Sequence, residues 1–135
     1  MATVDVSARL QNFDEQYIPF PPFVAAMNAI EANLQMFREA RVATHMLVTG
    51  EAGTGKSSLC RWLAHQHPRR VLPERDEVEI LITAVPPVAS ISSIASSMLR
   101  SLGDPHADKG TISQKSHRVV TLSRGCGVEM LLFDE

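Results

Sequence analysis

The run Gly50-Glu51-Ala52-Gly53-Thr54-Gly55-Lys56-Ser57 decides the fold class of this chain. It fits the pattern G-x-x-x-x-G-K-[ST], in which glycines let the backbone wrap around an anion so that successive N–H groups point at it. The lysine of the pattern reaches the β- and γ-phosphates of a nucleotide, and the hydroxyl that follows it sits on Mg²⁺. A helix beginning at Lys56 adds the positive end of its dipole. The run therefore predicts a nucleotide-binding loop with these contact residues: Gly50, Gly53, Thr54, Gly55, Lys56, Ser57 and Ser58.

The segments that flank this loop are those that a phosphate-binding loop requires. His45-Met46-Leu47-Val48-Thr49 reads as a short buried strand that leads into the loop. Leu59, Trp62 and Leu63 then form one apolar face of a helix, which must end before Pro68. A strand, a loop and a helix in this order indicate a nucleotide site at the carboxyl end of a parallel strand.

A second acidic motif ends the sequence. Four apolar residues from Met130 to Phe133 run into Asp134-Glu135, which matches the Walker B motif of phosphate sites. Asp134 would hold Mg²⁺ through water, and Glu135 would orient and polarise the attacking water as a catalytic residue beside Lys56. The alternative is an ordinary strand that ends in a solvated acidic pair. The position downstream of a phosphate loop favours Walker B.

The intervening sequence supplies the other elements of an α/β fold. The expected elements are an amphipathic helix from Phe23 to about Arg41, a strand over 78–84, a helix capped by Ser90 or Ser92 that ends at Gly103, and a helix from Ile112 to about Arg124. Taken in order, they predict a doubly wound parallel sheet flanked by helices, with its ligand at the carboxyl ends of the strands.

Residues 1–21 are expected to form an N-terminal arm, and 22–135 to form the nucleotide-binding domain. Aromatic residues alternate with prolines from Tyr17 to Phe23, so this segment can be neither a helix interior nor a central strand. Two interpretations remain open: a strap that packs on the core, or a segment that lines one side of the nucleotide's base.

The composition is that of an ordinary globular domain. The chain has 135 residues, 44% of them hydrophobic, and a net charge of −2. Since the chain is not basic overall, its net charge gives no support for nucleic-acid binding. Cys60 and Cys126 belong to no metal-binding cluster and are interpreted as reduced thiols of a cytoplasmic protein. His65 and His67 have the wrong spacing for two metal ligands on one helix face. No signal segment and no apolar run of about 18 residues is present, which predicts a soluble protein away from membranes.

With both motifs placed, the chain resembles the AAA+ ATPases, and within them the TniB family, the ATP-dependent regulators of bacterial DNA transposition related to TnsC. The closer resemblance rests on the segment 17–23, the phosphate loop, Pro86-Pro87 after the second strand, and Leu131 to Glu135. It implies a protein that uses ATP and Mg²⁺, assembles on DNA as a homo-oligomer and directs a transposase and a target-selection protein to the site.

One departure from this family limits the expectation. An AAA+ ATPase continues past Walker B with further strands, a sensor residue, an arginine finger and a helical lid, whereas this sequence ends at Glu135. In the family the fourth strand lies between the first and the third. The expectation is therefore a domain truncated after the Walker B strand and inactive alone as an ATPase. The alternative function is a nucleotide-gated adaptor with negligible hydrolysis.

A local excess of basic residues precedes Walker B. Between His106 and Gly125 four basic residues stand against one acidic residue, Asp108, and they are Lys109, Lys115, Arg118 and Arg124. This reversal of sign suggests contacts of Lys109, Lys115 and Arg118 with DNA phosphates. The alternative is a solvated helix face, which commonly carries three basic residues.

Overall fold

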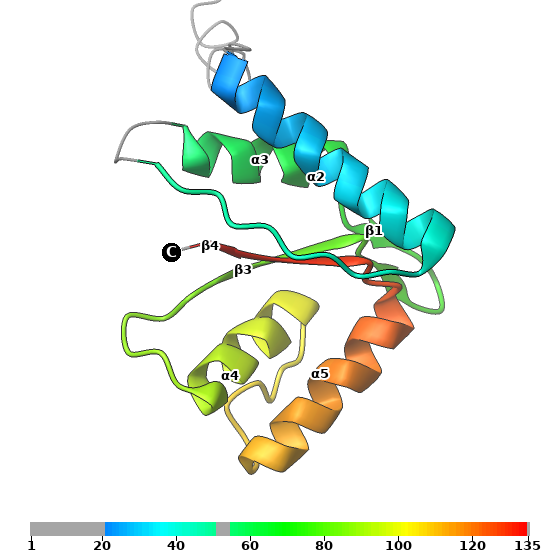
Figure 1. The fold of residues 1–135 in the computed structure, drawn as a ribbon. Helices are drawn as coiled ribbons and strands as arrows, with labels where there is room; N and C mark the ends of the chain where they lie inside the picture. Colours follow the sequence, from blue (N-terminus) through cyan, green and yellow to red (C-terminus); the bar gives the residue numbers. More distant parts are fainter. Residues whose placement is uncertain (1–20, 51–54, 135) are drawn as a thin grey trace, which may run out of the picture.

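In the computed structural model, residues 21–50 and 55–134 are described, and they form layers of helices on the two faces of a small sheet (Figure 1). One face is covered by α2 (Pro21–Ala40) and α3 (Lys56–Gln66), and the other by α4 (Ile91–Leu102) and α5 (Ile112–Cys126). The predicted α/β class is thus confirmed. The predicted N-terminal arm lies outside the described residues, apart from Pro21, which begins α2.

The sheet that separates these helices consists of β3 (Ile80–Ala84) and β4 (Met130–Asp134), which pair in parallel. Ile80 lies opposite Met130, and the register continues to the last pair at the carboxyl ends. Successive side chains of a strand point to opposite faces. Ile80 accordingly packs with α2 and α3, whereas Leu81 packs with α4 and α5.

Three buried leucines show that helices pack tightly on both faces of the sheet. Leu63 of α3 and Leu99 of α4 are fully buried. Leu34 of α2 is 1% exposed and belongs to the same cluster as Leu63. The apolar periodicity of the sequence therefore identified the buried face of each of these helices correctly.

The ends of α4 and α5 follow from local sequence. Ser90 caps α4, and Thr111 caps α5, each in a reciprocal capping box with the residue three positions on. Gly103 and Gly127 end the two helices with φ of 89° and 69°, the left-handed conformation that glycine adopts at least cost. The predicted end of α5 at about Arg124 was two residues too early, because the helix continues through Gly125 and Cys126 to its C-cap, Gly127.

The predicted first strand, His45–Thr49, is wrong for the described structure. Residues 41–50 form neither helix nor strand, all of them are exposed, and Leu47 is 84% exposed. A strand needs a neighbour for its N–H and C=O groups, and among the described strands β3 and β4 pair only with each other. An apolar run cannot supply that neighbour by itself.

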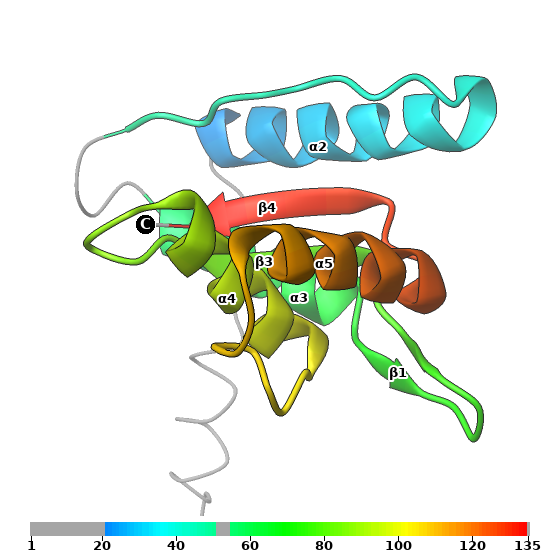
Figure 2. The same ribbon diagram turned by 90° about the horizontal axis from the view of Figure 1, so that it is seen from below.

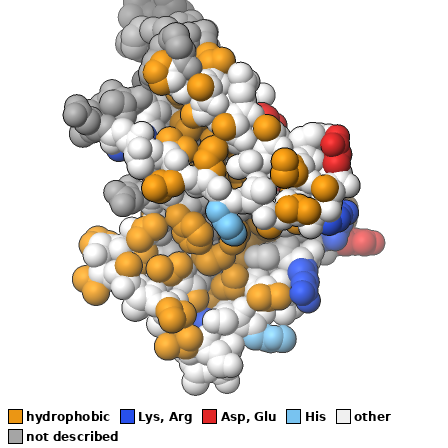
Figure 3. Space-filling view, viewed as in Figure 1, with side chains coloured by type: hydrophobic (Ala, Val, Ile, Leu, Met, Phe, Trp, Pro, Cys, Tyr) orange, Lys and Arg blue, Asp and Glu red, His pale blue; other side chains and the backbone are white. Residues whose placement is uncertain are grey.

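Apolar side chains gather on the face of the molecule seen in Figure 3.

The charged connection after α3 is an ordered hairpin. It consists of β1 (Arg70–Val71) and β2 (Asp76–Glu77) and projects from the layers in Figure 2. Arg70 Nη2 lies 2.7 Å from Glu77 Oε2, so opposite charges pair across the hairpin. No helix in the described part of the chain has both the length and the apolar character to cross a membrane.

Candidate functional site

The amino-terminal end of α3 is the candidate phosphate site. The residue before the helix, Gly55, has φ 92° and ψ 14°, a left-handed conformation that a side chain would strain. A glycine has no side-chain oxygen with which to cap the first N–H groups of the helix, which are left for an anion. Gly53 and Thr54, which were also predicted to contact phosphate, lie outside the described residues.

The first turn of α3 carries the polar side chains that the motif predicts. The Lys56 amine turns back to donate a hydrogen bond to the carbonyl of Gly50. This bond links the start of α3 to the residue that begins the loop. Ser57 is exposed. The hydroxyl of Ser58 accepts a long hydrogen bond of 3.4 Å from Arg61 Nη2. Gly50, Lys56, Ser57 and Ser58 therefore lie together at one end of α3.

The strand β4 brings its last residue, Asp134, to the same end of the molecule (Figure 1). The backbone carbonyl of Asp134 accepts a hydrogen bond of 2.8 Å from Val85 N–H, which fixes the end of the strand. Its carboxylate lies close to the thiol of Cys60 in α3. Since Cys60 follows Ser57 by three residues, both lie on one face of α3. Asp134 therefore lies toward the face of α3 that carries Ser57.

The pKa of the Cys60 thiol is affected by the charge of the Asp134 carboxylate. Burial raises the pKa of Cys60 above its ordinary value, and the negative charge of Asp134 and the hydrogen bond to it raise this pKa further. The thiol is thus kept in its neutral, hydrogen-bonding form beside the acid. Glu135, the predicted residue for water activation, lies outside the described residues.

The residues at this site fit a magnesium nucleotide. Hydroxyl and carboxylate oxygens, here those of Ser57 and Asp134, are the ligands that Mg²⁺ takes together with nucleotide phosphates. The uncapped helix end and the Lys56 amine supply the positive potential that phosphates require. In the described part of the chain, no cluster of three His, Cys, Asp or Glu side chains offers a metal cage made of protein alone.

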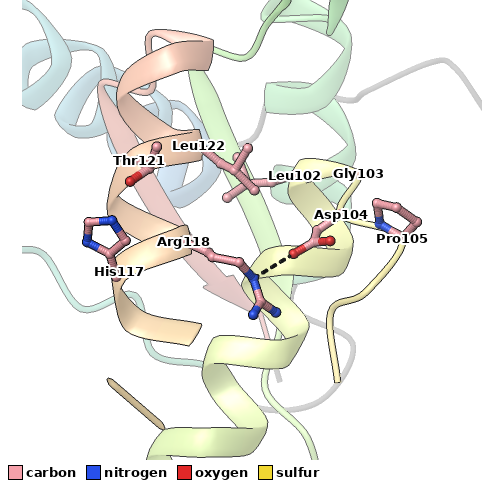
Figure 4. A pocket seen from close by; sticks show the side chains of 8 residues that line it. All are labelled: Leu102, Gly103, Asp104, Pro105, His117, Arg118, Thr121 and Leu122. Atoms are coloured by element: carbon pink, nitrogen blue, oxygen red, sulfur yellow. Dashed lines mark hydrogen bonds and ion pairs between the residues drawn. The ribbon is translucent and has the colours of Figure 1, made fainter. Parts of the chain in front are cut away.

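The predicted DNA contacts require a correction. Lys115 is only 6% exposed and donates a hydrogen bond of 2.9 Å to Ser92 Oγ, so its amine does not reach the surface where a phosphate would lie. Arg118 donates to Asp104 Oδ2 at 3.1 Å across a pocket between α5 and the end of α4 (Figure 4). Lys109 is exposed. Lys115 lies on the buried face of α5. A count of charged residues in the sequence does not show on which face of a helix each of them lies.

One protein family matches nearly the whole chain. Residues 9–135 match the family described as bacterial TniB protein, which is nearly the whole chain. The chain belongs to this family. Membership makes it a transposition-related regulator of the P-loop class and implies nucleotide binding. A comparison with curated proteins found no match.

Two features of this site and of its supports were missed by the sequence reasoning. Asp134 lies close enough to Cys60 for its charge to act on that thiol, and the spacing of Ser57 and Cys60 on one helix face was the available signal. His67 was considered only as a metal ligand, yet both of its ring nitrogens contact carboxylates, those of Glu31 and Glu79. No local pattern predicts that contact, because the two acids come from distant segments.

Proposed function

We propose that this chain binds ATP and Mg²⁺ through the loop 50–58 and acts as an ATP-hydrolysing regulator of DNA transposition. The observation that carries the proposal is the end of α3. There, a left-handed Gly55 leaves the helix without a side-chain cap, the Lys56 amine donates to the carbonyl of Gly50, and the charge of Asp134 acts on Cys60 of the same helix.

Each residue of the loop has a role in this proposal. The first N–H groups of α3 donate to the phosphates, together with the backbone of Gly53 and Thr54. The Lys56 amine exchanges the carbonyl of Gly50 for the β- and γ-phosphate oxygens, where its charge has more to stabilise. Backbone donors in fixed positions are independent of the base, so the loop recognises the phosphates and not the base.

The acidic end of β4 would complete the reaction site. Ser57 and Asp134 would hold Mg²⁺, which supplies charge neutralisation at the β- and γ-phosphates when bound. Glu135 would accept a proton from water and orient it toward the γ-phosphate. The nearby thiol of Cys60 would help to keep the Asp134 side chain beside α3, on the face that carries Ser57.

Membership of the TniB family supports the remaining part of the proposal. The ATP-bound protein assembles on DNA as a homo-oligomer and recruits a transposase and a target-selection protein. Two exposed basic residues near α5, Lys109 and Arg124, would contact DNA phosphates without reading bases. Replacing both with alanine should reduce the slope of log affinity against log salt by roughly two. An unchanged slope would exclude these two contacts.

Calorimetric titration with Mg–ATP tests the nucleotide site. Lys56→Ala should weaken binding by about 10- to 100-fold, since a charged hydrogen bond contributes about 1.5–3 kcal/mol. Lys109→Ala, measured without DNA, is the matched control because it removes an exposed lysine far from the loop in sequence. Equal affinities of the Lys56→Ala variant and the unchanged protein would reject the loop as the phosphate site.

A further inference from the structure

A group of charged side chains joins α2 to the amino ends of β3 and β4. These ends lie opposite the carboxyl ends, near which the candidate phosphate site is found. We call it the His67 junction, and its members are Glu31, Arg38, His67, Arg70, Glu79 and Glu129. Glu31 and Arg38 belong to α2, whereas Glu79 and Glu129 directly precede β3 and β4. The group therefore connects elements that are far apart in sequence.

His67 occupies the middle of this junction. Its Nε2 lies 3.0 Å from Glu31 Oε1 and its Nδ1 lies 2.9 Å from Glu79 Oε2, while its side chain is 12% exposed. An ionised carboxylate only accepts hydrogen bonds, so both ring nitrogens must carry a proton to donate to both acids. A neutral imidazole has one N–H and would leave its other nitrogen facing an acid without a hydrogen bond.

The surrounding charges favour the protonated ring. Burial lowers the pKa of His67, but hydrogen bonds to Glu31 and Glu79 and their charges outweigh it and raise this pKa above 6.5. In return, the hydrogen bond from His67 lowers the pKa of Glu79, and the charges of Arg38 and Arg70 lower it further. The two partners of this contact thus shift in opposite directions, as expected for an ion pair.

Two arginines hold the acids of the junction in place. Arg38 Nε lies 2.8 Å from Glu129 Oε2, and Arg38 Nη2 lies 3.3 Å from Glu79 Oε2. Arg70 Nη2 lies 3.3 Å from the other oxygen of Glu79 and 2.7 Å from Glu77 of β2. These guanidinium groups stay charged at any pH of interest. His67 is consequently the member of the junction whose charge changes near neutral pH.

We propose that the His67 junction is a proton-dependent clamp that holds α2 on the sheet and weakens as the pH rises. Because α2 leads through residues 41–50 directly into the phosphate loop, the clamp sets how firmly the helix before that loop is held. The imidazole of His67 has a raised pKa in the folded chain, so its contribution to holding α2 on the sheet is complete below pH 6.5. It is lost as the pH rises through the folded pKa of His67.

Titration of the histidine ring signals by NMR in the full chain tests the clamp directly. His67 should titrate above 6.5, and Glu31→Gln should lower its pKa because that change removes one of the two facing charges. Glu31 is partly exposed, so this variant keeps the buried packing of α2 intact. A His67 pKa at or below 6.5, or one unaltered in Glu31→Gln, would overturn the proposal.

Amide hydrogen exchange tests the conformational consequence. Relative to α4, the exchange of α2 should accelerate as the pH passes the His67 pKa, by up to about tenfold per unit of pKa difference. His67→Gln should abolish this pH dependence, whereas His65→Gln, which changes an exposed histidine two residues away, should preserve it. Equal pH dependence of α2 and α4 in the unchanged protein would contradict the clamp.

Discussion

Helices α3 and α4 both begin near the carboxyl ends of the strands, yet their first turns are capped differently. α4 closes its own end: Ser90 Oγ accepts from Ser93 N–H at 3.1 Å, and Ser93 Oγ accepts from Ser90 N–H at 2.8 Å. α3 begins after Gly55, which has no side chain to offer. The difference shows that α4 caps one of its first N–H groups with its own side chain, whereas α3 has no side-chain cap.

A substitution at Gly55 should break this comparison most severely. Gly55→Ala places a Cβ on a backbone with φ 92° and should cost about 1–2 kcal/mol of stability as well as weakening Mg–ATP binding. Gly125→Ala is the matched control, because Gly125 lies inside α5 and a Cβ added there would meet no atom within 4 Å. There the same change should stabilise the chain by about 0.5–1 kcal/mol.

Urea denaturation of both glycine variants, with calorimetry of Mg–ATP binding, measures the two effects. If Gly55→Ala were as stable as the unchanged protein and bound nucleotide equally well, the strained glycine would have no role in the site. A loss of stability in Gly125→Ala would show that the helical environment of α5 is described wrongly.

The closed helix end should respond to the loss of its cap and not to the nucleotide. Ser90→Ala removes the side-chain acceptor of the capping box and should cost about 1 kcal/mol, within a usual range of about 0.5–2 kcal/mol. Its affinity for Mg–ATP should stay unchanged, since neither α4 nor Ser90 belongs to the proposed nucleotide site. Denaturation and calorimetry on this one variant separate the outcomes, and a weakened affinity would mean that α4 also contributes to the site.

A smaller effect is expected at Cys60, where it can sharpen the position of Asp134 relative to α3. Asp134→Asn removes the negative charge that helps to raise the pKa of the Cys60 thiol, so this pKa should fall. Alkylation by iodoacetamide near neutral pH should then accelerate by about twofold to fivefold, because more thiolate forms while each thiolate reacts somewhat more slowly. Cys126 of the same chain is the internal control, and equal acceleration of both thiols would indicate general loosening instead.

The sequence predicted the parts of the fold that depend on local pattern. The capping residue Ser90, the terminating Gly103 and the buried faces of the helices follow from side chains within a few positions of one another. The strand His45–Thr49 failed for the opposite reason, because pairing depends on a neighbour that the run itself does not specify. An apolar run is thus necessary for a buried strand but insufficient.

The candidate site divides in the same way. Lys56 and Ser57 are adjacent to their helix end in sequence, so a short motif identifies them. The proximity of Asp134 to Cys60 depends on how β4 packs under α3, and the inward turn of Lys115 depends on which face of α5 meets α4. Sequence spacing therefore identified candidate residues, whereas tertiary packing decided which of them lie together and which are buried.

The central claim is that the open end of α3 and the end of β4 hold one magnesium nucleotide between them. NMR of the amide signals with Mn²⁺–ATP in place of Mg²⁺–ATP tests this most directly, since the paramagnetic ion broadens signals close to it. We predict that the signals of Ser57 and Asp134 both broaden, while that of Gly127, at the far end of α5, stays sharp. Broadening at Ser57 without Asp134, or at neither residue, would contradict the claim.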